Sequence, residues 1–144
     1  MKKKLYVHIG MGKTGTTALQ NFFAENRKVL SRHDLNYPTH GVMSNAHHLL
    51  SPHVPRFLED QWTFESVEEW APRLVKSREN RILLSSELRA WADEAKARSF
   101  CAQVSAFFDL HVVVCLRRQD SLIMARYNQR RKAGPQRRRI DLIY

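Results

Sequence analysis

The fold is decided by residues 5–17, which read Leu5-Tyr6-Val7-His8-Ile9-Gly10-Met11-Gly12-Lys13-Thr14-Gly15-Thr16-Thr17. The first five residues form a short, mainly apolar run with β-branched members, which predicts a buried strand. Gly10 and Gly15 then enclose four residues, and a helical pattern begins at Thr16. Such a turn directs backbone N–H groups at one point, where the helix adds the positive end of its dipole. The segment therefore predicts a phosphate-binding loop.

The rest of the chain alternates further helices with apolar strands. We expect strands over residues 5–9, 81–85 and 110–116. We expect helices over residues 16–31, 94–108 and 120–132, and a further helix that starts after the capping box of Ser66. Nearly continuous apolar strands between helices indicate a parallel sheet covered on both faces. We predict a single α/β domain over residues 1–144, three-layered and similar to P-loop NTPases, with its ligand at the carboxyl ends of the strands.

Composition limits the class of protein. The apolar fraction of 43% is enough for a core, and Cys101 and Cys115 are too few for a disulfide framework, so reduced core thiols are expected. No stretch approaches the roughly 20 apolar residues that a membrane span requires. A soluble, cytoplasmic protein is the resulting expectation.

The positive charge of the chain is concentrated near its end. Residues 117–139 hold nine Lys or Arg and a single acid, Asp120, and so contribute +8 of the net charge of +10. A basic segment of this kind suits an acidic small ligand, a nucleic acid or an acidic partner.

The loop differs from that of ATPases in the position of its lysine. A Walker loop has lysine directly after the second glycine; here Thr16 occupies that place, and the lysine is Lys13 at the crown of the loop. No strand ends in an aspartate that would hold Mg²⁺, and no His/Cys spacing suits a metal, so no metal is expected. The strand 110–116 instead runs into Arg117-Arg118, which suits a second phosphate held without metal.

These motifs resemble a known enzyme family. Gly10 to Thr17 followed by Ala18-Leu19-Gln20 resembles the 5′-phosphosulfate loop of sulfotransferases that use 3′-phosphoadenosine 5′-phosphosulfate (PAPS). Residues 116–120 and 127–129 resemble the 3′-phosphate strand and helix of bacterial members, and residues 82–87 resemble the strand end between the two motifs.

The resemblance implies transfer of a sulfuryl group from PAPS to a hydroxyl or amine of a small-molecule or carbohydrate acceptor. It implies that Lys13 stabilises charge on the leaving phosphate oxygen. The residues implied to hold the 5′-phosphate are Gly12, Lys13, Thr14, Gly15, Thr16 and Thr17.

The same resemblance implies that Arg117 grips the 3′-phosphate. Many family members have a serine eight residues later; Ala125 stands here, and Ser121 or Arg118 could substitute for it. Glu87 and His48 are the candidate general bases, since both lie near a strand end or a loop facing the acceptor. Family members are usually longer and carry a further basic loop over the nucleotide, so a truncated chain with impaired activity is expected.

Two other functions compete with sulfuryl transfer. One is a kinase-like P-loop phosphotransferase, against which the lysine position and the missing aspartate count. The other is a polyanion-binding or nucleic-acid-binding module that uses residues 117–139. Because no aromatic interleaving or reader motif occurs there, no specific nucleic acid partner is expected.

Overall fold

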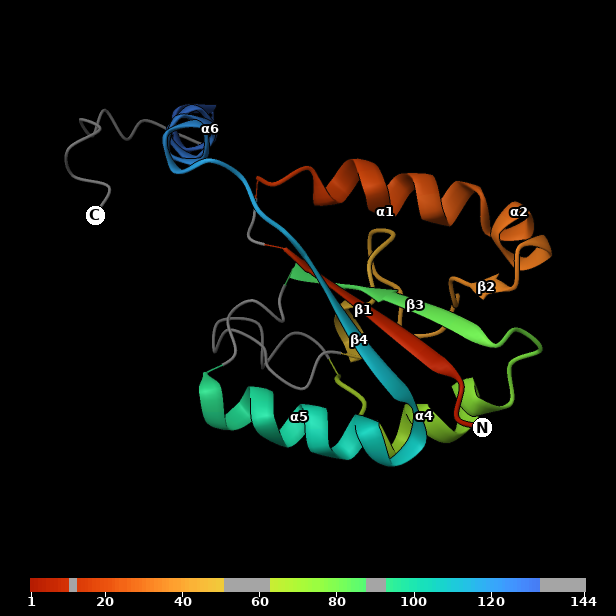
Figure 1. Ribbon diagram of the computed structural model, residues 1–144. Helices are drawn as coiled ribbons and strands as arrows, with labels where there is room; N and C mark the ends of the chain where they lie inside the picture. The colour runs from red at the N-terminus through yellow and green to blue at the C-terminus, as the bar shows by residue number, and fades with distance from the viewer. Residues whose placement is uncertain (11–12, 51–62, 88–92, 133–144) are drawn as a thin grey trace.

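The protein is an α/β fold built on a parallel four-stranded sheet (Figure 1). The computed structural model describes residues 1–10, 13–50, 63–87 and 93–132. The strands are β1 (Lys4–Gly10), β2 (Leu35–Asn36), β3 (Arg81–Ser85) and β4 (Asp109–Cys115), in the order β2-β3-β1-β4. The helices are α1 (Thr16–Glu25), α2 (Arg27–Arg32), the 3-10 turn η1 (His48–Leu50), α4 (Val67–Val75), α5 (Glu94–Phe107) and α6 (Gln119–Lys132). The predicted α/β class and parallel sheet are thus confirmed.

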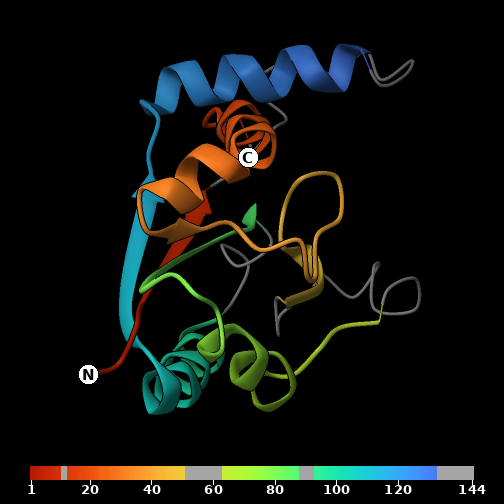
Figure 2. The same cartoon turned by 90° about the vertical axis from the view of Figure 1, so that its right-hand side faces the viewer.

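β1 lies at the switch point of the sheet: β2 and β3 are placed on one side of it, and the next strand along the chain, β4, on the other. β1 pairs with β3 on one side and with β4 on the other. α1 and α2 lie on one face of the sheet, whereas α4 and α5 lie on the opposite face (Figures 1 and 2). In open parallel sheets, ligands bind outside the carboxyl ends of the strands at such a switch point. The loop after β1 occupies this place.

The hydrophobic core lies between the sheet and the layer of α4 and α5. Leu5 and Val7 of β1 point into it, together with Trp70 of α4 and Phe108 after α5, and all four are almost fully buried. The two aromatic rings stack at 6.3 Å between centroids. In the described residues, no helix combines the length and apolarity required to cross a membrane.

The helix expected over residues 16–31 is divided in two. α1 ends at Glu25, Asn26 leaves helical geometry, and α2 follows. Helical spacing of Phe22 and Val29 predicts that both face the core, but both are about half exposed, and the buried residues of α1 are Thr16 and Gln20. The inward face of α1 is polar because Gln20 forms hydrogen bonds with residues at the end of β3, as described below.

The helix after Ser66 begins where its capping box predicts. Ser66 and Glu69 form the reciprocal hydrogen bonds, and α4 starts at Val67. Pro72 lies inside α4.

The strand expected over 110–116 is present but is not buried. β4 lies at the end of the strand order, and Val112, Val113 and Val114 are each exposed by 42–51%. The two cysteines are free and half-buried, so they are not core residues. A run of apolar, β-branched residues predicts that a segment forms a strand, but it does not predict whether the strand lies in the centre or at the edge of the sheet.

Candidate functional site at the carboxyl ends of the strands

The loop after β1 curls back over its first glycine. A Cβ atom at Gly10 would lie 2.5 Å from Thr16 Cγ2 and 3.0 Å from Thr14 Oγ1, so a side chain does not fit at this position. Lys13 and Gly15 both have positive φ, at 76° and 87°. Residues 11 and 12, including the predicted contact Gly12, lie outside the described part of the chain. The described part of the loop, residues 13–15, is thus tightly turned.

The start of α1 is open toward this loop. Gly15 is the N-cap residue, no side chain caps the helix, and the first turn contains no acid. The first backbone N–H groups of a helix have no partner within it, and they carry the positive end of the dipole. Thr16 is buried and Thr17 exposed at this turn. The helix start therefore offers N–H groups and a hydroxyl to an anion.

Arg117 is brought to the same loop by the register of the sheet. Gly10 pairs with Cys115, so the ends of β1 and β4 are level. Two residues farther on, Arg117 Nη1 donates a hydrogen bond of 2.9 Å to the carbonyl oxygen of Lys13. The guanidinium is exposed, and its remaining N–H groups are donors for a ligand.

A cavity of about 360 Å³ extends from Arg117 along α6. Its lining residues are Arg117, Asp120, Ser121, Met124, Ala125 and Asn128. Ser121 and Ala125 are four residues apart and so share one face of α6, and Arg117 lies two residues before the helix begins. The arginine, the serine and the alanine singled out from the sequence thus share one cavity.

The other arginine of the pair has a different partner. Arg118 forms an ion pair with Asp120 at 2.5 Å, and this hydrogen bond is the main reason why the pKa of Asp120 lies below its ordinary value. Arg118 does not line the cavity within the described residues, so Ser121 is the better placed of the two expected substitutes for a serine at 125.

Glu87 is held at the end of β3 by a residue of α1. Gln20 Nε2 donates to Glu87 Oε2 at 2.8 Å and to Ser85 Oγ at 3.1 Å. Both N–H bonds of the amide are therefore used, and one carboxylate oxygen of Glu87 is held by Gln20. Neither Gln20 nor Ser85 was singled out from the sequence. The available signal was that Gln20 follows Thr16 by one helical turn and so shares its face.

His8 extends this buried cluster toward β4. Its Nδ1 lies 2.8 Å from Ser85 Oγ and its Nε2 lies 3.1 Å from Cys115 Sγ. Burial lowers the pKa of His8 below its ordinary value, and the negative charge of Glu87 opposes this shift. His8 is therefore a neutral, hydrogen-bonded core group. His111, on the neighbouring strand β4, is half-buried; it bonds Asp109 and stacks on Tyr6.

His48 also reaches the end of β3. Its Nδ1 lies 2.9 Å from Ser86 Oγ, and the backbone N–H of Ser86 donates to the carbonyl of His8. His47, in contrast, is fully buried and bonds Pro38 O and the N–H of Ser85, which makes it a structural residue. The two candidate bases thus flank Ser86 at the edge to which the loop belongs.

The site brings together the glycine loop, the guanidinium of Arg117 and two possible proton acceptors, Glu87 and His48. Among the described residues, no group of three or more His, Cys, Asp or Glu side chains is arranged to hold a metal ion. In comparisons with known proteins, no family model, no curated protein and no solved structure matches the chain.

Proposed function

We propose that this protein is a PAPS-dependent sulfotransferase with a P-loop-like donor site. The observation that carries the proposal is the hydrogen-bonded contact between the glycine loop after β1 and Arg117, which follows the neighbouring strand β4. Arg117 bonds the loop itself, so one ligand can contact both elements. A nucleotide with phosphate groups at its 3′ and 5′ positions has the matching charges.

In this proposal the loop and the start of α1 hold the 5′-phosphosulfate. Their N–H groups and Thr16 would bind its oxygens, as helix starts bind other phosphates. The transfer forms a bond between the acceptor oxygen or nitrogen and sulfur, and breaks the bond between sulfur and the bridging oxygen. Lys13 would stabilise the negative charge that develops on that leaving oxygen.

The acceptor proton needs a base at the same edge of the sheet. Glu87 suits this role because Gln20 fixes its Oε2, and a fixed carboxylate loses little freedom when it accepts a proton. His48 is the alternative base, held through Ser86. The acceptor class in this proposal is a hydroxyl or amine of a small molecule or carbohydrate.

The 3′-phosphate would lie in the cavity beside α6. Arg117 would donate from one side and Ser121 from the next turn of the helix. An arginine fork matches a phosphate better than a lysine does.

The direct test is calorimetric titration of the chain with adenosine 3′,5′-bisphosphate in the presence of a chelator. We expect saturable binding without magnesium, and clearly weaker binding of adenosine 5′-monophosphate. Magnesium-dependent binding of ATP, with no preference for a 3′-phosphate, would favour a kinase-like phosphotransferase. Salt-sensitive binding to any polyanion that is unchanged in Lys13→Ala would favour the polyanion-binding module.

A further inference from the structure

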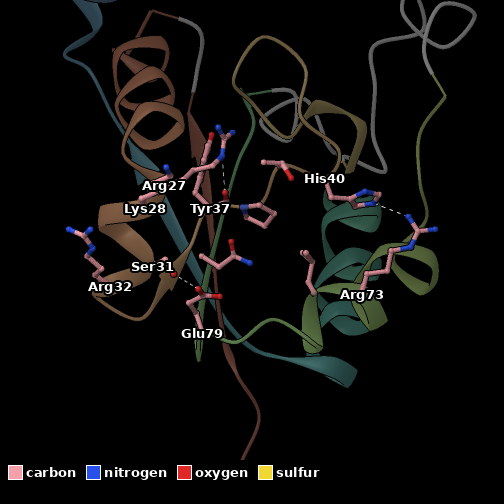
Figure 3. A pocket seen from close by; sticks show the side chains of 12 residues that line it. Arg27, Lys28, Ser31, Arg32, Tyr37, His40, Arg73 and Glu79 are labelled. Carbon is pink, nitrogen blue, oxygen red and sulfur yellow. Dashed lines mark hydrogen bonds between the residues drawn. The ribbon is translucent and has the colours of Figure 1, made fainter.

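A second cavity lies away from the loop, at the β2 edge of the sheet. It has a volume of about 710 Å³ and is bounded by α2, the chain after β2 and α4 (Figure 3). α1, with its ten residues, separates α2 from the phosphate loop, a length of roughly 15 Å at 1.5 Å per residue. A ligand in this cavity therefore does not contact the start of α1.

The cavity exists because β2 is very short. β2 pairs with β3 only at Leu35 and Asn36, after which the chain reaches Pro38, whose nitrogen cannot donate to a ladder. At this edge of the sheet, no full-length strand therefore fills the space between the helices on its two faces. Tyr37, Pro38 and Leu74, all buried, provide an apolar part of the lining.

The polar lining is strongly basic. It contains four cations, Arg27, Lys28, Arg32 and Arg73, and one carboxylate, Glu79. Glu79 accepts hydrogen bonds from Ser31 Oγ at 2.5 Å and from Ser77 Oγ at 2.6 Å, and the Ser31 bond is the main cause of its lowered pKa. The lining therefore carries four positive charges against the one negative charge of Glu79, and Glu65, which pairs with Arg73, lies outside it.

The cations stand on two opposite walls. On the α2 wall, Arg27 donates to Tyr37 O and Ala24 O and lies 5.3 Å from the Tyr37 ring centroid, which fixes its guanidinium. Lys28, beside it, has no hydrogen bond or ion pair within the described ranges. Arg32 extends outward at the rim (Figure 3).

The α4 wall carries Arg73 close to His40. Arg73 Nη1 lies 3.1 Å from His40 Nε2 and 3.3 Å from Glu65 Oε2. The Arg73 side chain is 61% exposed, so the contact with Glu65 is a weak, water-screened pair that leaves most of its N–H donors available. Figure 3 shows the Arg73 side chain turned toward His40 and away from α2, so an anionic group between the walls would contact the α2 cations directly and Arg73 after this exposed side chain turns into the cavity.

We infer that this cavity binds a small organic anion with at least two acidic oxyanion groups, one for each wall. Its volume lies in the range of sites for molecules of the size of a disaccharide or sugar phosphate. The arginines and Lys28 would bind the sulfate, phosphate or carboxylate groups. The inference does not depend on the proposed sulfotransferase activity, because none of the lining residues belongs to the donor site.

The test is calorimetric titration of the full chain with two probes, a disulfated disaccharide and fructose 1,6-bisphosphate. Each has a neutral control, the unsulfated disaccharide and fructose. We expect at least one dianion to bind and its neutral parent not to bind; the stronger probe identifies the source of the oxyanions. Arg73→Gln and Lys28→Gln should each weaken binding by roughly fivefold or more, as expected for loss of a charge-assisted hydrogen bond.

Lys76→Gln is the matched control, because Lys76 ends the same helix as Arg73, is exposed, and does not line the cavity. It should weaken binding less than twofold, and Lys13→Ala should leave it unchanged. The inference is overturned if neither dianion binds, if Lys76→Gln and Arg73→Gln weaken binding equally, or if adenosine 3′,5′-bisphosphate displaces the probe. Failure of that nucleotide to bind would count against the proposed function and not against this site.

Discussion

Ala125→Ser tests the proposed 3′-phosphate site most directly. Ala125 is half-buried and lines the same cavity as Arg117 and Ser121, so a hydroxyl at 125 would point to where the phosphate is proposed to lie. A hydrogen bond to a charged group contributes roughly 1.5–3 kcal/mol. The cavity is open to water, which competes for the phosphate, so we expect about 1 kcal/mol, or roughly fivefold tighter binding.

The assay is calorimetric titration of wild type and variant with adenosine 3′,5′-bisphosphate and adenosine 5′-monophosphate. The variant should gain affinity for the first ligand and not for the second, which lacks the 3′-phosphate. Ala125→Val is the control for added volume without a hydroxyl and should not gain affinity. Serine is a weaker helix former than alanine by roughly 0.5 kcal/mol, so the thermal midpoint should fall slightly. Equal affinities of wild type and Ala125→Ser, or an equal gain for both nucleotides, would refute the placement of the phosphate.

Four further predictions concern the loop, the arginine and the buried histidine. Gly10→Ala should abolish binding of adenosine 3′,5′-bisphosphate while the circular dichroism stays helical, because its methyl group would lie 2.5 Å from Thr16 Cγ2; unchanged affinity would contradict the loop geometry. Lys13→Ala should raise the activation free energy of sulfuryl transfer by about 2–4 kcal/mol, while the affinity for the product nucleotide changes far less; a normal transfer rate would exclude this role. Arg117→Lys should weaken binding of the 3′,5′-bisphosphate more than that of the 5′-monophosphate, since lysine lacks the fork; equal losses would indicate a structural role. The pKa of His8 in the folded state lies below its ordinary value of 6.5. Its contribution to the free energy of unfolding is therefore complete above pH 6.5 and is lost as pH falls through the folded pKa. Chemical denaturation between pH 4.5 and 7.5 should show the free energy of unfolding falling with pH in wild type, and falling less in His8→Asn.

The features that the sequence predicted correctly are local. The strand, glycine turn and helix start at residues 4–17 depend on neighbours in the chain, as does the capping box at Ser66. The break between α1 and α2 at Asn26 was missed because helical periodicity continues across it. Propensity is a weak guide where packing against other elements decides the end of a helix.

Tertiary arrangement explains what the sequence did not predict. The link from Gln20 to Glu87 joins residues 67 positions apart, and the bond from Arg117 to Lys13 joins residues 104 apart. The second basic cavity arises from the shortness of β2, which leaves a gap between two layers. Neither kind of feature leaves a spacing pattern in one sequence. The predicted phosphate contact Gly12 and the part of the basic segment after residue 132 lie outside the described residues.

The two halves of the proposed donor site differ in how firmly the fold holds them. Glu87 follows β3, a strand with buried residues on both sides and a hydrogen-bonded link to α1. Arg117 follows β4, whose central valines are exposed and whose far end leads into α6, which has no fully buried residue among those described. A ligand that binds the loop and Arg117 together would therefore add contacts to the less firmly held half. Since such a ligand binds the folded state alone, its binding free energy would stabilise β4 and α6 more than β3. In the proposed enzyme, the donor nucleotide would thus complete the ordering of its own 3′-phosphate site, whereas the candidate base on β3 is in place before it arrives.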